Sequence, residues 1–237
     1  MNRYVNNAIV AVAAFSLLLA CTTGDHVDTI PGVPDGAEDL GIVMTREDGT
    51  TYKLYWSKSN LGKEGLCPNP EDFGVYYAWG ETEVKLDYSW STYKFGSSSD
   101  GPFSKYNTNE ASGTVDNIIV LEEADDVAHV KLGGKWRMPT DAEWAELLEK
   151  CTWVWMEQND VNGYEVTAPN GKSIFLPAAG FRYNTASYDI GSSGFYLSSS
   201  LNSDYPYTAR YVYFISNDMS RGSSGRYYGR SIRPVSE

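Results

Sequence analysis

A change of pattern near residue 151 limits the fold of this chain more than any other feature of its sequence. Just before it, Thr140–Glu143 have the form of a capping box. In such a box the Thr140 hydroxyl can accept a hydrogen bond from the backbone N–H of Glu143, and the Glu143 carboxylate can accept one from the backbone N–H of Thr140. Trp144, Leu147 and Cys151 follow at helical spacing on one face. The pattern predicts a helix that begins at this box and packs its tryptophan into a core.

After residue 151 the chain offers only short strand candidates, separated by Gly, Asn and Ser. One further strand candidate and a weaker helix, Glu122–Lys131, precede the capping box. The acidic residues of the weaker helix come early, where the helix dipole favours them. The predicted strands are Thr51–Ser57, Tyr164–Thr167, Ser173–Leu176, Phe195–Ser199, Arg210–Ile215 and Ser231–Val235. Two helices among short strands, without an internal repeat, predict one α+β domain.

The strand candidate Arg210–Ile215 also predicts which side chains share a face. Val212 and Phe214 alternate with Tyr211 and Tyr213. Successive side chains of a strand point to opposite faces. We therefore expect Val212 and Phe214 on one face, and Tyr211, Tyr213 and Ile215 on the other.

The amino-terminal residues predict a signal peptide over residues 1–20. Arg3 is the only charged side chain before Asp25, and an almost wholly apolar run extends from Ala8 to Ala20. Such a run is too short to span a bilayer as a stable helix, which needs about 20 apolar residues. The run ends in Leu-Leu-Ala-Cys, which resembles the lipobox of bacterial lipoproteins. The resemblance implies cleavage before Cys21 and lipid on its sulfur.

This leader sets the expected organisation of the rest of the chain. Residues 21–40 are polar, acidic and rich in Pro and Gly, which predicts a flexible tether. Residues 41–237 are then the folded domain. A lipid anchor would keep that domain on a membrane at the cell envelope. We expect the outer membrane, with exposure at the cell surface as an open possibility.

Charge is distributed unevenly along the chain. The net charge of −12 argues against a nucleic-acid partner, because binding phosphates needs a basic face. Residues 181–237 differ from the rest, with six Arg, no Lys, four acidic residues and nine of the 18 Tyr. Tyr, Arg and Trp dominate binding hot spots. The composition therefore predicts a recognition surface in the last quarter of the chain.

Five segments together resemble the major-paralogous-domain (FISUMP-type) lipoproteins of Gram-negative gut bacteria. They are YYAWGET (76–82), GGKWRMPTDAEWAEL (133–147), SIFLPAAGFR (173–182), YLSSS (196–200) and YYGRSIRPV (227–235). The second segment is also distantly similar to the formylglycine-generating-enzyme/sulfatase-modifying superfamily. The resemblance implies a C-type-lectin-like fold. In that fold the first and last strands pair, two helices flank small antiparallel sheets, and long loops carry binding.

The resemblance also implies which residues bind. The C-terminal segment is similar to the variable region of retroelement-diversified proteins with this fold, in which a constant frame supports exposed binding residues. The implied frame is Ser198–Ser200, Ala209, Val212, Phe214, Arg226, Gly229 and Ser231–Val235. The implied ligand-binding set is Asn202, Tyr205, Tyr207, Arg210, Tyr211, Tyr213, Asn217, Arg221, Tyr227, Tyr228 and Arg230. Arg233 and Arg137 are expected instead to be buried, paired structural residues.

Departures from the related families argue against catalysis. Formylglycine-generating enzymes use cysteines late in the domain, and this chain has none after Cys151. Calcium-binding lectins carry Glu-Pro-Asn or Gln-Pro-Asp and Trp-Asn-Asp triplets, which are absent here. Outside the cytoplasm Cys67 and Cys151 could form a disulfide, and the sequence leaves that open.

Other chemistry has weak support. The acidic pairs at 122–123 and 125–126 are best explained as solvated partners of a helix dipole, although calcium there remains an alternative. With only His26 and His129 in the chain, a zinc site built on histidines is excluded. Trp153 and Trp155 could stack on sugars, but a strand that buries both indoles is the favoured interpretation. We expect no cofactor and no metal.

These observations predict a lipid-anchored, non-catalytic binding or adhesion module for a protein or glycan ligand. Two alternatives remain open at this point: a structural envelope or fimbria-associated subunit without a separate ligand, and a sulfatase-modifying-type enzyme.

Overall fold

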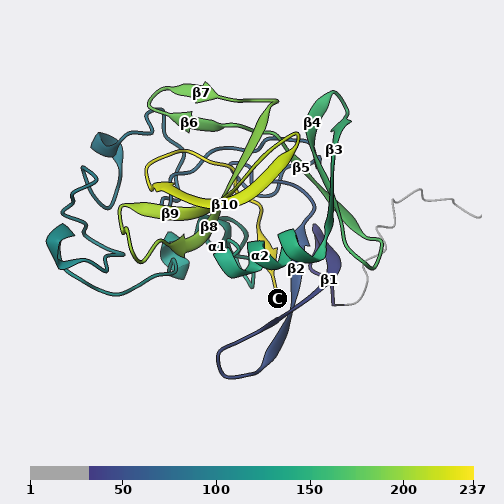
Figure 1. Cartoon of the computed structure of the whole chain (residues 1–237), viewed down its shortest axis with the longest axis horizontal. Helices are drawn as coiled ribbons and strands as arrows, with labels where there is room; N and C mark the ends of the chain where they lie inside the picture. Colours follow the sequence, from purple (N-terminus) through teal and green to yellow (C-terminus); the bar gives the residue numbers. More distant parts are fainter. Residues whose placement is uncertain (1–31) are drawn as a thin grey trace, which may run out of the picture. The chain divides into compact units, whose positions relative to one another are not determined.

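The computed structural model describes residues 32–237, which belong to one compact unit, Pro31–Glu237. The signal peptide, Cys21 and the first part of the expected tether lie outside the described residues. The unit has an α+β fold with two α-helices and small antiparallel sheets, as the sequence predicts (Figure 1). The helical elements are η1 (Trp90–Thr92), η2 (Glu110–Ser112), η3 (Glu123–Asp125), α1 (Val127–Leu132) and α2 (Asp141–Lys150).

The strands form four separate antiparallel sheets. The first has the order β1 (Ala37–Thr45), β2 (Thr51–Ser57), β11 (Val235–Ser236). The second has the order β3 (Thr152–Gln158), β4 (Val161–Thr167), β5 (Ser173–Pro177). The third has the order β10 (Asp218–Gly225), β9 (Thr208–Ile215), β8 (Ser193–Leu201). A two-stranded sheet joins β6 (Phe181–Tyr183) to β7 (Ala186–Tyr188).

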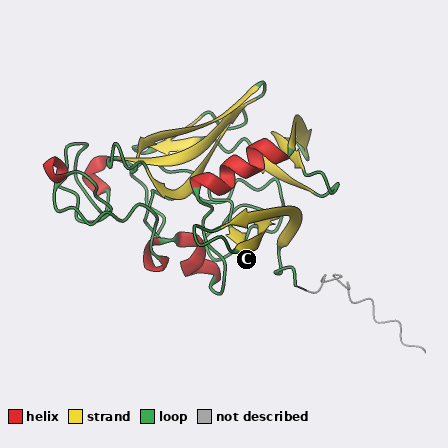
Figure 2. Ribbon diagram, turned by 60° about the horizontal axis from the view of Figure 1, so that its bottom comes forward, coloured by secondary structure: helices red, strands yellow, loops and turns green. Residues whose placement is uncertain are grey.

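Helix α2 forms because its capping box is complete. The Thr140 hydroxyl accepts from the Glu143 backbone N–H at 3.2 Å, and the Glu143 carboxylate accepts from the Thr140 N–H at 2.7 Å. Figure 2 shows α2 lying along the sheet of β8, β9 and β10. Trp144 is fully buried there, with its ring 4.7 Å from that of Trp56. The sequence prediction for this helix is confirmed.

The weaker predicted helix is divided in two. Residues 123–125 form η3, and α1 begins only at Val127. Asp126 ends η3 and is the N-cap of α1, because its side chain accepts from the backbone N–H groups of Ala128 and His129. Asp125 and Asp126 are both buried, so the expectation of solvated carboxylates is wrong for these two. Glu122 and Glu123 are exposed, as expected.

The folded domain begins earlier than residue 41. β1 starts at Ala37, and four residues assigned to the tether belong to this strand. Leu40, Ile42 and Met44 alternate with exposed residues and enter the core, which is the signal that the acidic, Gly-rich composition conceals. A bulge between Glu38 and Ile42 interrupts its pairing with β2.

The two ends of the domain lie side by side. β11 pairs with β2 through Val235 opposite Trp56, so the expected pairing of first and last strand candidates is confirmed. β11 is much shorter than the predicted strand over 231–235. Pro234 lacks an N–H group for a ladder, although its carbonyl accepts from the backbone N–H of Ser57 at 2.9 Å.

Two hydrophobic clusters meet on β8. Tyr196 belongs to the cluster around Trp56 and Trp144, whereas its neighbour Leu197 belongs to the cluster around Trp79. β8 is consequently buried on both faces for most of its length. β9 is buried on one face, with Val212 and Phe214 in the first cluster, as its alternation predicts.

Candidate ligand-binding groove

A groove of about 430 Å³ opens at the end of the β9–β10 hairpin that is farthest from its turn. We call it the tyrosine groove. The segment between β2 and α1, coloured blue to teal in Figure 1, runs as loops beside this sheet and supplies part of the lining. The lining residues are Trp90, Ser99, Tyr205, Tyr207, Thr208, Ser223, Ser224, Gly225, Tyr227 and Tyr228. Five aromatic rings and several hydroxyl groups therefore face one hollow.

The rings form two groups on the groove walls. Tyr227 and Tyr228 stack with centroids 4.4 Å apart, and Trp90 in η1 lies 4.8 Å from Tyr227. Tyr205 and Tyr207 form the other group, edge to face at 6.0 Å. They are 56% and 36% exposed, which leaves their faces open to a ligand.

Arg226 fixes the position of the Tyr205–Tyr207 turn. Its Nη1 donates to the Pro206 carbonyl at 2.8 Å, and its backbone N–H donates to the Tyr207 carbonyl at 3.2 Å. The guanidinium is buried in an aromatic box, 4.8 Å from the ring of Phe103 and 5.1 Å from that of Trp79. This arrangement makes Arg226 a positioning residue of the groove, in agreement with its place in the implied frame.

Arg230 lies beneath the stacked tyrosines. Its guanidinium is 4.0 Å from the ring centroid of Tyr211 and 5.3 Å from that of Tyr228. Its Nη2 donates to the hydroxyl of Ser224, a lining residue, while Nε and Nη1 have no hydrogen-bond partner. Burial lowers the pKa of Arg230 to about 10, which still leaves it charged at neutral pH.

Asn202 lies below the other wall. Its Nδ2 donates to the hydroxyl of Ser223 at 2.9 Å, and its Oδ1 accepts from Arg210 at 3.3 Å. Arg210 therefore acts on the groove through Asn202. Ser223 and Ser224, just before the end of β10, thus each accept a hydrogen bond from a buried side chain.

The structure separates the implied ligand-binding set into groups. Tyr205, Tyr207, Tyr227 and Tyr228 come together in the groove. Asn202 and Arg230 were expected to be exposed, and this is wrong: they are 4% and 3% exposed. Both side chains turn inward and donate hydrogen bonds to Ser223 and Ser224 of β10, and so they lie beneath the groove lining.

The remaining members of the set lie elsewhere. Tyr211 and Tyr213 are half-buried on the outer face of β9, where their rings pack 6.0 and 4.9 Å from that of Phe195. Asn217 lies in the turn between β9 and β10. Arg221 is exposed, but it pairs with Asp141 at the start of α2, with 2.7 Å between Nη1 and Oδ2. These positions leave all four outside the groove lining.

The implied frame is buried, with one exception. Of its residues only Ser200 is partly exposed. The groove also contains residues that the sequence did not indicate, above all Trp90, Ser223 and Ser224. Trp90 is far away in the chain, and residues 218–225 are rich in Ser and Gly, which have low strand propensity. Pairing with β9 makes them a strand nonetheless.

Other reactive groups have structural surroundings. Cys67 and Cys151 are both free thiols, half-buried, and burial raises the pKa of Cys151 to about 11. A thiol with that pKa is protonated at neutral pH and a poor nucleophile. Arg137 pairs with Glu143 and Glu237 as expected, while Arg233 is buried and donates to two backbone carbonyls instead of an acid. Residues 32–237 contain no cluster of three or more His, Cys, Asp or Glu suited to a metal ion.

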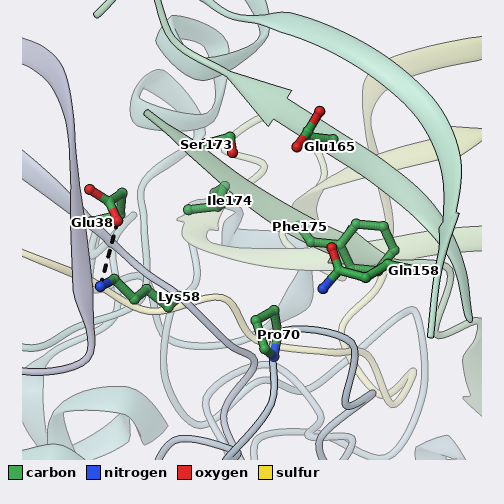
Figure 3. Close-up of a pocket in the computed structure, with 8 residues that line it drawn as sticks. All are labelled: Glu38, Lys58, Pro70, Gln158, Glu165, Ser173, Ile174 and Phe175. Atoms are coloured by element: carbon green, nitrogen blue, oxygen red, sulfur yellow. Dashed lines mark ion pairs between the residues drawn. The ribbon is translucent and has the colours of Figure 1, made fainter. Parts of the chain in front are cut away.

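A second hollow, of about 290 Å³, lies between β1, the sheet of β3, β4 and β5, and the loop at Pro70 (Figure 3). Two of its three charged lining residues pair, since the Lys58 Nζ lies 3.6 Å from a carboxylate oxygen of Glu38, while the third, Glu165, belongs to no ion pair of residues 32–237. Lys172 approaches the Glu38 carboxylate at 3.9 Å. One aromatic side chain, Phe175, lines this hollow, against five in the tyrosine groove. Trp153 and Trp155 are half-buried against the core on β3, as predicted.

Comparison with protein-family models, curated proteins and solved structures finds no match to this chain. Among the described residues no helix is both long and apolar enough to cross a membrane. The fold and the groove thus define an α+β domain with an open aromatic site, whose rings come from the loops at one end of the β9–β10 hairpin and from η1.

Proposed function

We propose that this protein is a non-catalytic, lipid-anchored binding protein of the cell envelope, with a C-type-lectin-like fold, and that the tyrosine groove binds a saccharide. The carrying observation is the groove lining itself: five aromatic rings and four hydroxyl-bearing Ser and Thr side chains around one open hollow. Aromatic rings offer flat apolar surface with a polar tip, and hydroxyl groups supply directional hydrogen bonds. That combination suits the alternating C–H and O–H surface of a sugar.

The arrangement of the domain supports the lectin-like proposal. β2 and β11 bring the two ends of the domain together, α1 and α2 accompany small antiparallel sheets, and a long loop segment lies beside the third sheet. The proposed lipid on Cys21 would hold the domain at a membrane. In the groove, Tyr and Trp side chains have few rotatable bonds, so they lose little conformational entropy when a ligand binds.

The direct test is binding to an array of saccharides and proteins by the wild type and a Tyr205→Ala/Tyr227→Ala variant. We expect the variant to lose about tenfold or more in affinity for a saccharide. Tyr55→Ala on β2 is the control, because Tyr55 is half-buried like Tyr227 but lies in another sheet, outside the groove. It should bind like the wild type.

The same measurement separates the alternatives. Binding to proteins alone would replace the saccharide with a protein ligand. Assembly of the wild type into polymers, without any ligand, would contradict the proposal and favour a structural subunit. Turnover of a cysteine-containing substrate peptide would contradict the non-catalytic part.

A further inference from the structure

We infer that the saccharide of the tyrosine groove carries an anionic group, a carboxylate or a sulfate, which is recognised at Ser224 above the Arg230 guanidinium. This inference rests on the proposed function and narrows its ligand class.

The first step is the uncompensated charge of Arg230. The side chain is 3% exposed, and two of its nitrogen atoms have no hydrogen-bond partner. Its one side-chain partner is a neutral hydroxyl, and no ion pair of residues 32–237 includes it. A buried cation without a counterion is unfavourable, and an anion brought close to it offsets that cost.

The second step is the absence of acidic side chains from the groove. None of the described residues that line it is Asp or Glu, although the chain has a net charge of −12. Asp100 directly follows the lining residue Ser99, and Asp204 directly precedes Tyr205, but neither aspartate lines the groove. A second buried guanidinium, Arg226, lies at the Tyr205–Tyr207 turn on the other wall and donates to carbonyl and hydroxyl oxygens only. The groove is therefore a positive site on an acidic protein.

The third step is the direction of the hydrogen bonds. Ser224 accepts from Arg230, and Ser223 accepts from Asn202. A hydroxyl has a single proton to donate, and in each serine that proton is left free for a ligand in the groove. The Tyr227 hydroxyl is also protonated at neutral pH, as the ordinary tyrosine pKa of about 10 requires, and burial raises its pKa further. A site rich in donors is complementary to an acceptor, and most strongly to an anionic one.

The experiment is titration calorimetry of the full chain with oligosaccharides matched in length: a polygalacturonate fragment, a sulfated heparin fragment and a neutral maltooligosaccharide. We expect at least one acidic oligosaccharide to bind about tenfold or more tighter than the neutral one, with an affinity that falls as salt rises. The carboxylate and sulfate arms show which anion is preferred.

Two variants test the residues. Ser224→Ala leaves Arg230 in place and should lower the affinity for the acidic oligosaccharide about tenfold, with little change for the neutral one. Arg230→Gln should lower the affinity for the acidic oligosaccharide by at least the same factor. Arg221→Gln is the matched control, because it also removes one positive charge, but from a position paired with Asp141 outside the groove. It should bind like the wild type.

The outcomes are distinguishable. Equal binding of neutral and acidic oligosaccharides would overturn this inference and leave the proposed saccharide function intact. An equal loss in Arg221→Gln and Ser224→Ala would also overturn it, since the attraction would then be unspecific. Absence of any saccharide binding would overturn both.

Discussion

Glu143 has two structural roles, of which the sequence indicates one. Its carboxylate completes the capping box of α2 with the Thr140 N–H. The same carboxylate accepts from both terminal nitrogens of Arg137, at 2.8 and 2.6 Å, and from the Tyr52 hydroxyl at 2.8 Å. It is fully buried. One side chain thus joins β2, the loop before α2 and the helix itself.

We expect Glu143→Gln to lower the free energy of unfolding at pH 7 by about 2–3 kcal/mol, because it leaves the Arg137 guanidinium without its buried counterion. Urea unfolding measures the effect. Glu149→Gln on the exposed side of the same helix is the control and should change stability by less than about 0.5 kcal/mol. An equal effect of the two substitutions would contradict the role of the ion pair.

The pH dependence of this pair has a definite sign. Burial opposes the charge, but Arg137, the capping N–H and Tyr52 together hold the pKa of Glu143 below its ordinary value. A lowered folded-state pKa stabilises the protein above the unfolded pKa of about 4.3, and this contribution is lost as the pH falls through the folded pKa. The difference between wild type and Glu143→Gln should therefore shrink as the pH falls below about 4.3, in the same urea experiments.

At the scale of the element, β8 depends on a glycine that the sequence does not mark. Gly194 lies opposite Phe214 on β9, and a Cβ atom placed there would lie 2.0 Å from the Phe214 ring. That ring is fully buried, so it has no free space to move into. The Phe214 ring thus occupies the space that a side chain at Gly194 would need, and it stacks with the Tyr196 ring at 5.8 Å.

We expect Gly194→Ala to destabilise the protein by about 1–3 kcal/mol through overpacking. Thermal or urea unfolding measures the change. Gly65→Ala is the matched control, since no atom lies within 4 Å of its added methyl group. It should be close to neutral. Equal stability of the two variants would show that the core near Phe214 has room to adjust.

At the scale of the whole molecule, the two hydrophobic clusters share strands. β8 and β9 contribute Tyr196, Val212 and Phe214 to one cluster and Leu197, Leu201 and Ala209 to the other. Indole N–H groups from both clusters also donate to β8, Trp144 to the Leu197 carbonyl and Trp79 to that of Ser198. Neither cluster can lose its structure without exposing the other.

We therefore expect the domain to unfold in urea as one cooperative transition. Tryptophan fluorescence and far-ultraviolet circular dichroism should give midpoints that coincide within experimental error. Leu197→Ala, where the two clusters meet, should lower the free energy of unfolding by about 2–4 kcal/mol. Both midpoints should then move together to a lower urea concentration. Two separate transitions would show that the clusters are independent units.

The sequence alone determined the features that depend on neighbours within a few residues. The capping box predicts α2, the alternation in 210–215 assigns the faces of β9, and the mixture of elements predicts an α+β fold. The composition of the last quarter indicates a Tyr- and Arg-rich surface, and the family resemblance implies the four tyrosines of the groove. Each of these signals is local, because helix capping and strand alternation act over one turn or one pleat.

Only the tertiary structure decided which side chains meet. Arg230 and Arg221 have the same local appearance, yet one is buried below the groove and the other pairs with Asp141 on the surface. Trp90 reaches the groove from a distant loop, and β10 exists because β9 offers it a partner. Burial and long-range pairing depend on the packing of segments far apart in the chain, and no local pattern records that packing.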